Sequence, residues 1–205
     1  HSIEDIVNLC NENNMSFWQV ILRADASERM AAEDASFATM RDMYRAMKRA
    51  DAEYDKTLKS PSGLSGGDGE KMRKYNKDGK NLCGPFMGLA MEKAIKMGES
   101  NACMKRIVAA PTAGSCGVIP AVFLAYEECF NVPEDKMVKA MFVSAGVGAV
   151  IAENASIAGA SGGCQAEIGS ASAMAAAGLA YLEGGDAECI SNAMAFALKN
   201  MLGLT

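Results

Sequence analysis

Hydrophobic residues recur at helical spacing along most of the chain. Between residues 3 and 10 the apolar positions fall at i, i+3, i+4 and i+7, which predicts a short helix. Ser16 is a good N-cap for a second helix that contains Trp18 and Ile21. A third apolar stripe, between residues 33 and about 55, consists of Phe37, Met40, Met43, Tyr44 and Met47. A methionine stripe of this kind indicates ordinary core packing on an amphipathic helix.

The helical pattern resumes after a break at residues 59–80. Helices are predicted over 85–98, with Pro85 in the first turn, over 102–108, 118–130, 134–152 and 166–183, and from the N-cap Asp186 to residue 202, with Gly203 at the C-cap. No stretch alternates apolar and polar residues as a half-buried strand does. We therefore predict an all-α fold in one domain over 1–205, with N-terminal helices at 1–58, a Gly/Ser-rich loop at 59–80 and an Ala/Gly/Met-rich helical core at 81–205.

Composition and charge narrow the classes of function. Half of the residues are hydrophobic but only 6% are aromatic, which suits closely packed helices. The net charge of −5 gives no electrostatic footprint for nucleic acid. The longest apolar run, 140–152, is shorter than the roughly 20 residues of a membrane span. We expect a cytoplasmic protein without a signal peptide that binds neither nucleic acid nor membrane.

Histidine and cysteine usage limits the chemistry further. His1 is the only histidine, so a Ser/His/Asp triad or an H-E-x-x-H zinc helix would need an imidazole from a second chain. The seven cysteines show no C-x-x-C pairing and are expected to be reduced thiols. Five of them fall on apolar helical faces and are predicted to pack as small hydrophobic residues: Cys10, Cys83, Cys103, Cys129 and Cys189. The surroundings of Cys116 leave its role open.

Three loops of small polar residues interrupt the helical pattern, at 59–70, 110–117 and 153–165. Glycine lets a backbone approach a ligand closely, and amides at a following helix N-terminus favour anions. Such loops suit a carboxylate or a phosphate, although each one also fits a tight turn between helices. In the third loop, glycines before Cys164 leave its thiol open to a ligand. The alternative for Cys164 is a small buried hydrophobic residue.

Four strings of residues carry a family resemblance. They are SPSGLSGGDGEKM (60–72), APTAGSCGVIPAV (110–122), NASIAGASGGCQAEIGSASAMAAAGL (154–179) and KNMLGLT (199–205). In this order they closely resemble the α chain, or α domain, of bacterial iron–sulfur-dependent L-serine dehydratases. The resemblance implies deamination of L-serine to pyruvate and ammonia at a [4Fe–4S] cluster, on a mainly helical domain that works with a β chain or β domain.

The same resemblance implies where the cluster is bound. The first cluster cysteine of the family lies in the GCQ motif, which is Cys164 here. The other two belong to a Cys-Asp-Pro segment that directly follows Leu-Gly-Leu-Thr, and to a Val-Pro-Cys further on. This sequence ends at Thr205, so the cluster is not expected to be held by the chain as given, which we expect to be inactive alone.

Elimination of the β-hydroxyl of serine needs a Lewis acid for the leaving hydroxide and a base for the α-proton. We consider Lys59 and Asp68 as bases, beside a histidine from the β chain's Ser-Ser-Ser-His-Thr motif. Four residues are candidates to hold the substrate carboxylate, Ser62, Ser65, Gly67 and Thr112, while Asn154 is a candidate to bind the ammonium group or to orient a loop.

Two alternatives to this function stay open. A pyridoxal-phosphate β-eliminase would use loop 62–69 to cradle phosphate and would need a Schiff-base lysine, but the chain lacks alternating β and α units. A helical interaction module would have no chemistry of its own. The oligomeric state, including a homo-oligomer, and the choice between serine and threonine are left open by the sequence.

Overall fold

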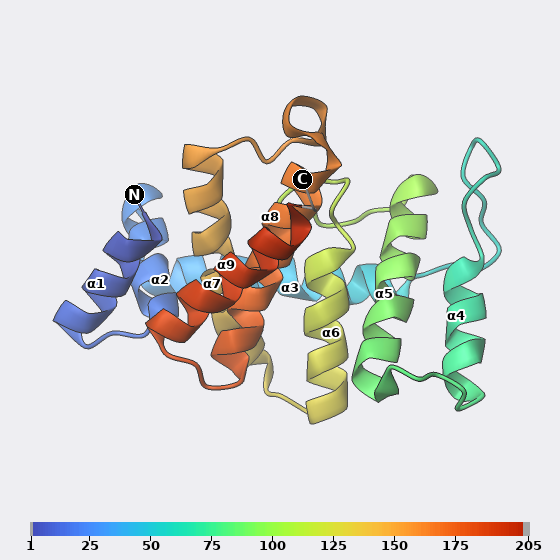
Figure 1. The fold of residues 1–205 in the computed structure, drawn as a ribbon, viewed down its shortest axis with the longest axis horizontal. Helices are drawn as coiled ribbons and strands as arrows, with labels where there is room; N and C mark the ends of the chain where they lie inside the picture. The colour runs from blue at the N-terminus through green and yellow to red at the C-terminus, as the bar shows by residue number, and fades with distance from the viewer. Residues whose placement is uncertain (1, 203–205) are drawn as a thin grey trace. The chain divides into compact units, whose positions relative to one another are not determined.

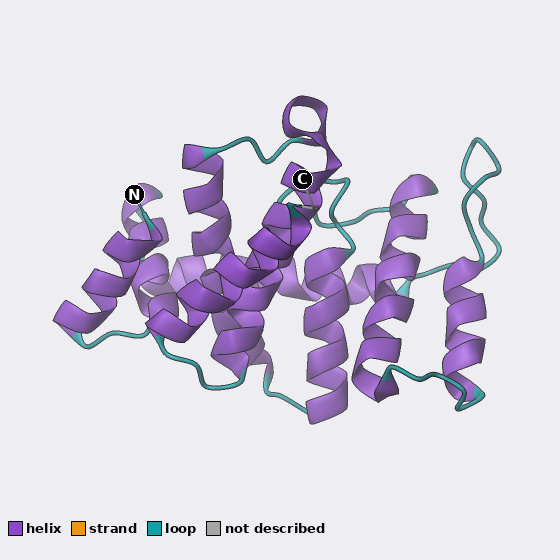
Figure 2. Ribbon diagram, viewed as in Figure 1, coloured by secondary structure: helices purple, strands orange, loops and turns teal. Residues whose placement is uncertain are grey.

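The computed structural model describes residues 2–202, and within that range the chain forms nine α-helices and no strands (Figures 1 and 2). They are α1 (Ile3–Asn13), α2 (Phe17–Glu28), α3 (Glu33–Ala52), α4 (Asp68–Lys77), α5 (Gly84–Ala102), α6 (Val118–Phe130), α7 (Glu134–Asn154), α8 (Gly159–Leu182) and α9 (Ala187–Met201). The all-α class predicted from the sequence is confirmed.

Side chains cap the starts of several helices, among them the two N-caps predicted from the sequence, Ser16 and Asp186. Ser2 forms a capping box with Asp5 at the start of α1, where its hydroxyl accepts the Asp5 N–H at 3.0 Å. The Ser16 N–H donates to the Gln19 side chain at 2.9 Å before α2. At α9 the Asp186 carboxylate accepts the Cys189 N–H at 2.8 Å. The predicted C-cap Gly203 lies outside the described residues.

The chain divides into two compact units. The first unit comprises residues 1–44 and 134–205, and the second comprises residues 45–133, so the boundary at 44/45 falls inside α3. These boundaries differ from the sequence-based division of one domain at residues 58 and 80. The first unit combines two segments that are far apart in the sequence, and local periodicity does not reveal such a pairing.

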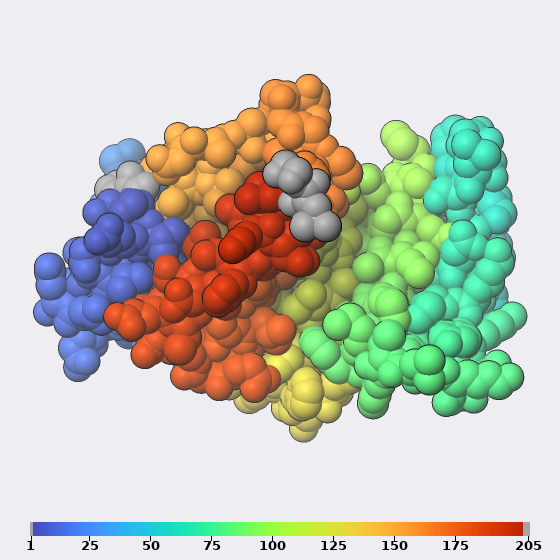
Figure 3. Space-filling view, viewed as in Figure 1, coloured from blue at the N-terminus to red at the C-terminus, as the bar shows by residue number. Residues whose placement is uncertain are grey.

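The core of the first unit is built around α7, which packs on α2 and α8, while α9 packs on α8 and covers it from the viewer's side in Figure 3. A Cβ atom at Gly146 would lie 2.5 Å from the Ile21 side chain, so glycine permits this close approach. The Ser144 hydroxyl donates to the Met174 carbonyl at 2.7 Å. Although α7 meets the length and hydropathy criteria for a membrane span, 56% of that window is buried, as in a core helix.

In the second unit α5 packs against α4 and α6. Met97 and Cys116 are buried together with Ala50, and the half-buried Ile107 packs on them. An aromatic cluster of Phe86, Tyr126 and Phe130 joins α5 to α6, with ring centroids 4.7–6.2 Å apart. The helix α5 is thus the central element of this unit.

The prediction of a loop over 59–80 is wrong for its second half, where α4 forms. This helix has no apolar stripe and depends on charges instead. Asp68 pairs with Lys71 at 2.6 Å, and the Glu70 carboxylate accepts both hydrogen bonds of a bidentate contact from Arg73 at 2.6 Å. Acidic residues lie in the first turn and lysines in the last, which suits the helix dipole.

Two other predicted segments also differ. Residues 103–108 are not helical, because α5 ends at Ala102 and Met104 has a positive φ of 61°. Conversely, α8 begins inside the predicted loop 153–165 and is kinked at Gly163, where φ is 76° and ψ is 175°. The first turn of α8 stands apart from the rest of the helix in Figure 1 (orange).

The packing predicted for the cysteines is correct only in part. Cys10 is buried, but Cys83, Cys129 and Cys189 are exposed and Cys103 is half-buried, because each lies on the solvent side or at the end of its helix. Cys116, left open by the sequence, is buried. None of the seven described cysteines forms a disulfide.

Candidate active site

Residues 60–67, which we call the serine loop, form a closed turn before α4. The Ser60 N–H donates to the Ser65 carbonyl at 2.9 Å, and the Ser65 N–H donates to the Ser60 hydroxyl at 3.1 Å. Ser60 is buried, whereas Ser62 is exposed with its hydroxyl 3.1 Å from that of Ser60. The loop therefore presents Ser62 to solvent on a base that is internally hydrogen-bonded.

The two glycines at the end of the serine loop have backbone angles that favour glycine. Gly66 has φ of 130° and Gly67 has φ of 86°. A Cβ atom at Gly66 would lie only 2.3 Å from the Leu58 carbonyl oxygen. The turn into α4 thus requires glycine for both conformation and space.

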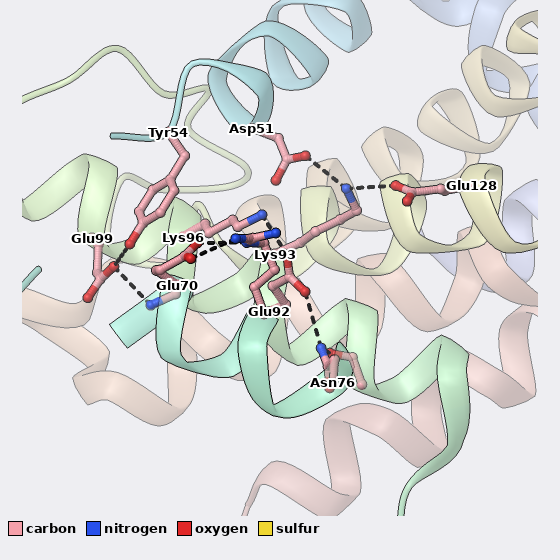
Figure 4. Close-up of polar contacts among 12 residues, drawn as sticks. Asp51, Tyr54, Glu70, Asn76, Glu92, Lys93, Lys96, Glu99 and Glu128 are labelled. Carbon is pink, nitrogen blue, oxygen red and sulfur yellow. Dashed lines mark hydrogen bonds and ion pairs between the residues drawn. The ribbon is translucent and has the colours of Figure 1, made fainter. Parts of the chain in front are cut away.

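Glu99, on the last turn of α5, caps the start of α4. Its carboxylate accepts the Asp68 N–H at 2.6 Å and the Gly69 N–H at 3.1 Å. It also accepts the Tyr54 hydroxyl at 2.5 Å (Figure 4). Glu99 is only 5% exposed, so this is a buried carboxylate with three donors. The sequence analysis predicts that amides at this helix N-terminus bind an anion. For the amides of Asp68 and Gly69 this anion is the Glu99 carboxylate of the protein itself.

The electrostatics of this contact keep both side chains in one protonation state. Burial would raise the pKa of Glu99, but the hydrogen bonds from Tyr54, Asp68 and Gly69 outweigh it and lower that pKa below its usual 4.5. Burial, and then the Glu99 carboxylate, raise the pKa of Tyr54 above its usual 10. Glu99 is thus a carboxylate and Tyr54 a neutral phenol at neutral pH.

The two residues considered as bases flank the serine loop. The Lys59 ammonium donates to the Gly66 carbonyl oxygen. The Asp68 carboxylate binds Lys71, and this contact lowers the pKa of Asp68. A lowered pKa makes Asp68 a weaker base. The roles of both residues stay predictions.

The loop 110–117 is held by the same end of α5. The Asn101 side chain donates to the Ala113 carbonyl at 3.0 Å. Thr112 has its hydroxyl 3.0 Å from that of Ser115, which is buried. The last turn of α5 therefore contacts two of the three loops that the sequence singles out, through Glu99 and Asn101.

A charge-rich cleft of about 720 Å³ lies beside Tyr54 in the second unit, lined by residues 51–57 and by Glu70, Arg73, Lys96 and Lys105. Arg73 is bound to Glu70, whose pKa it lowers to about 2, and Lys96 is bound to the buried Glu92 at 2.5 Å. Glu92 also accepts from Asn76 at 3.2 Å (Figure 4). None of the described residues predicted to bind substrate lines this cleft. Because Arg73 and Lys96 are already paired, we assign the candidate site to the loops.

A second ion cluster, formed around the buried Lys93, lies beside this network. Lys93, 8% exposed in its side chain, binds Asp51 at 2.8 Å and Glu128 at 3.0 Å (Figure 4). Burial would lower the pKa of Lys93, but the two carboxylates outweigh it and raise that pKa. The cluster ties the end of α3 and the end of α6 to α5, and so supports the helix that carries Glu99 and Asn101.

Asn154 and Cys164 belong to the first unit. The Asn154 side chain donates to the Val150 carbonyl at 2.8 Å, within the last turn of α7. Cys164 follows the kink at Gly163 and is exposed, as the interpretation of an open thiol requires. The next residue, Gln165, donates to the Leu202 carbonyl at 3.5 Å, so the end of α9 lies beside this segment. Both candidates are thus in a different unit from the serine loop.

The described residues do not fit a four-iron cluster by themselves. In residues 2–202 no group of three or more His, Cys, Asp or Glu side chains is arranged to hold a metal ion. Cys164 brings one thiolate, whereas a cluster needs several brought together.

Tyr54, Glu99 and Asn101 are the supporting residues that the sequence-based reasoning missed. The contact between Tyr54 and Glu99 spans 45 residues of the chain, that between Glu99 and Asp68 spans 31, and that between Asn101 and Ala113 spans 12. A motif search over a short window of sequence therefore does not identify these residues. The one available signal is that Glu92 and Glu99, seven residues apart, share a face of a helix that is otherwise rich in apolar residues.

Comparison with known proteins identifies the class to which this fold and these loops belong. Residues 12–205 match the family described as "Serine dehydratase alpha chain". The chain belongs to this family, as the resemblance of its motifs predicts.

Individual relatives agree with the family. The chain is 38% identical to the probable L-serine dehydratase, alpha chain, of Bacillus subtilis, over 99% of this chain and 68% of that protein. It is 35% identical to the L-serine dehydratase, alpha chain, of Peptoniphilus asaccharolyticus, over 100% of this chain and 70% of the relative. It is also 34% identical to the L-serine dehydratase of Streptomyces coelicolor, over 98% of this chain but only 45% of the relative.

Proposed function

We propose that this chain is the α part of an L-serine dehydratase, a lyase that converts L-serine to pyruvate and ammonia. Family membership and relatives named as L-serine dehydratases support the reaction. Two of those relatives are named as alpha chains, which supports a β chain as the partner. The observation that carries the proposal is the match of residues 12–205 to the serine dehydratase alpha chain family.

We assign binding of the substrate carboxylate to two loops of the second unit. The hydroxyl of Ser62 is exposed on the serine loop, and Thr112 contributes a hydroxyl from the second loop. Hydroxyl groups that are already oriented by neighbours lose little freedom on binding an anion, and their orientation by Ser60 and Ser115 supports this role. In this proposal these two side chains bind and orient the carboxylate of L-serine, and Ser65 and Gly67 contribute further groups of the serine loop to the same carboxylate.

A [4Fe–4S] cluster is the cofactor in this proposal. When bound, it supplies a Lewis acid for the leaving hydroxyl group. Cys164 is the one ligand that we assign to it in this chain. The exposed thiol of Cys164, beside the end of α9, supports this assignment.

The activity and the cofactor are tested together. The intact enzyme is expressed with its β partner under anaerobic conditions, and iron, sulfide and serine-dependent pyruvate are measured. We expect about four irons per α part and pyruvate that depends on this chain. No iron and no pyruvate would contradict the proposal and favour the non-catalytic helical module, whereas an aldimine absorbance band abolished by borohydride would favour the pyridoxal-phosphate enzyme.

A further inference from the structure

The start of α4 is capped from a distant element rather than locally. A helix N-terminus is usually capped by a Ser, Thr, Asp or Asn side chain at the N-cap position. Here the N-cap is Gly67, whose φ of 86° differs from the extended conformation of such caps. The amides of Asp68 and Gly69 are bound instead by Glu99, which lies 31 and 30 residues further along the chain.

A distant cap has a consequence that a local cap lacks. A serine or aspartate at the N-cap would satisfy the amides wherever the helix moved. Because Glu99 belongs to α5, its bonds fix the start of α4 relative to that helix. The C-terminal end of the serine loop is then held by two contacts, from the Lys59 ammonium to the Gly66 carbonyl and from the first amides of α4 to Glu99.

The chemistry of the contact requires a carboxylate. One Glu99 oxygen accepts the Asp68 N–H, and the other accepts both the Gly69 N–H and the Tyr54 hydroxyl. Both oxygens therefore face donors. A glutamine would turn an NH2 group toward at least one of these donors, leaving buried groups unpaired.

We propose that Glu99 is a positioning residue of the dehydratase, which with Tyr54 fixes the serine loop so that Ser62 and Ser65 meet the carboxylate of L-serine. Its part in substrate binding rests on the proposed function, whereas its bracing of the loop does not. Glu99 itself does not touch the substrate.

The test compares Glu99→Gln with Glu92→Gln in the intact enzyme. Glu92 is a matched control because it is also a buried carboxylate on α5, 6% exposed, but binds Lys96 and Asn76 rather than the loop. We expect Glu99→Gln to raise KM for L-serine roughly tenfold or more with a smaller change in kcat, since it leaves a buried donor unpaired. Glu92→Gln should leave KM within about twofold of the wild-type value, even if it lowers the melting temperature as much as Glu99→Gln does.

Amide hydrogen exchange tests the bracing of the serine loop by Glu99 separately from its part in substrate binding. Glu99→Gln should speed exchange at Asp68 and Gly69 and through residues 60–67, and Glu92→Gln should not. If wild type makes no pyruvate, the proposed function fails while exchange still tests the brace. If pyruvate forms but both variants change KM equally, or loop exchange is unchanged in Glu99→Gln, the inference fails alone.

If Glu99→Gln does not fold, a milder variant tests the positioning role of Glu99. Tyr54→Phe removes one of the three donors and keeps the carboxylate. We expect a KM increase of about two- to fivefold with faster exchange at residues 60–69. Unchanged KM together with unchanged exchange in Tyr54→Phe would overturn the proposal.

Discussion

Glu99 and Asn101, two residues apart on the last turn of α5, bind different loops: Glu99 binds the amides of Asp68 and Gly69 after the serine loop, and Asn101 binds the Ala113 carbonyl in the loop 110–117. A single helix end thereby positions the two segments of the second unit to which we assign substrate binding. The ion cluster of Lys93 with Asp51 and Glu128 lies two turns earlier on the same helix and holds it in place.

Substitution of Asn101 should affect the second loop selectively. In Asn101→Ala the Ala113 carbonyl loses its donor, which should lower the free energy of unfolding by about 1 kcal/mol. Amide exchange should become faster at residues 113–116 and stay unchanged at residues 60–67, because Glu99 still holds the serine loop. Equal changes in both loops would mean that the substitution disturbs α5 as a whole.

The two glycines Gly66 and Gly63 give a matched pair for the shape of the serine loop. In Gly66→Ala the new methyl group would overlap the Leu58 carbonyl, so we expect a loss of roughly 3 kcal/mol or more in the free energy of unfolding. Gly63 also has a positive φ, of 74°, but nothing lies within 4 Å of its Cβ position. Gly63→Ala should therefore cost only about 1–2 kcal/mol. Chemical denaturation measures both, and equal losses would contradict the close approach at Gly66.

Tyr54 should make the stability of the protein fall at alkaline pH. Burial and Glu99 raise the pKa of its phenol above the usual 10, so the folded state retains a proton that the unfolded state loses. The stabilisation from Tyr54 is fully present below pH 10 and is lost as the pH rises above it. In Tyr54→Phe the free energy of unfolding should decline less steeply above pH 10 than in wild type. Parallel curves for the two proteins would contradict the Tyr54–Glu99 contact.

Cys164 should be needed for iron, and Cys189 should not. Both cysteines are exposed and belong to the first unit, so Cys189→Ser controls for the loss of an accessible thiol. In the anaerobic intact enzyme we expect Cys164→Ser to lose most of the iron and the cluster absorbance, since one of its thiolate ligands is removed. Full iron content in Cys164→Ser would exclude the cysteine as a ligand.

Periodicity predicted most of the apolar helices, but it also predicted a helix over 102–108 that does not form, and it missed the polar helix α4. The helix α6 spans Val118–Phe130, as its apolar positions indicate, because burial of an amphipathic face decides both the pattern and the fold. In α4 only Gly69 is buried, so this helix has no apolar stripe from which periodicity could predict it. That helix is stabilised by ion pairs and by the cap from Glu99, which no window of local sequence contains.

In the candidate site, too, some residues could be predicted from local sequence motifs and others could not. The positions of Ser62, Thr112 and Cys164 follow from motifs whose resemblance to the family is local in sequence. The residues that support these loops bind through contacts over 12 to 45 residues, and their identity depends on packing of α5. The general base has no such signature within the described residues, where Lys59 and Asp68 are both engaged with neighbours.

The Michaelis constant for L-serine in Ser62→Ala, Thr112→Ala and the double variant tests the central claim most directly. If both loops bind the same substrate carboxylate, each single variant should raise KM by about five- to tenfold, the expected effect of losing a hydrogen bond to a charged group. The two effects should combine non-additively in the double variant, because the residues share one ligand. Unchanged KM and kcat in all three variants would contradict the assignment of these loops to substrate binding.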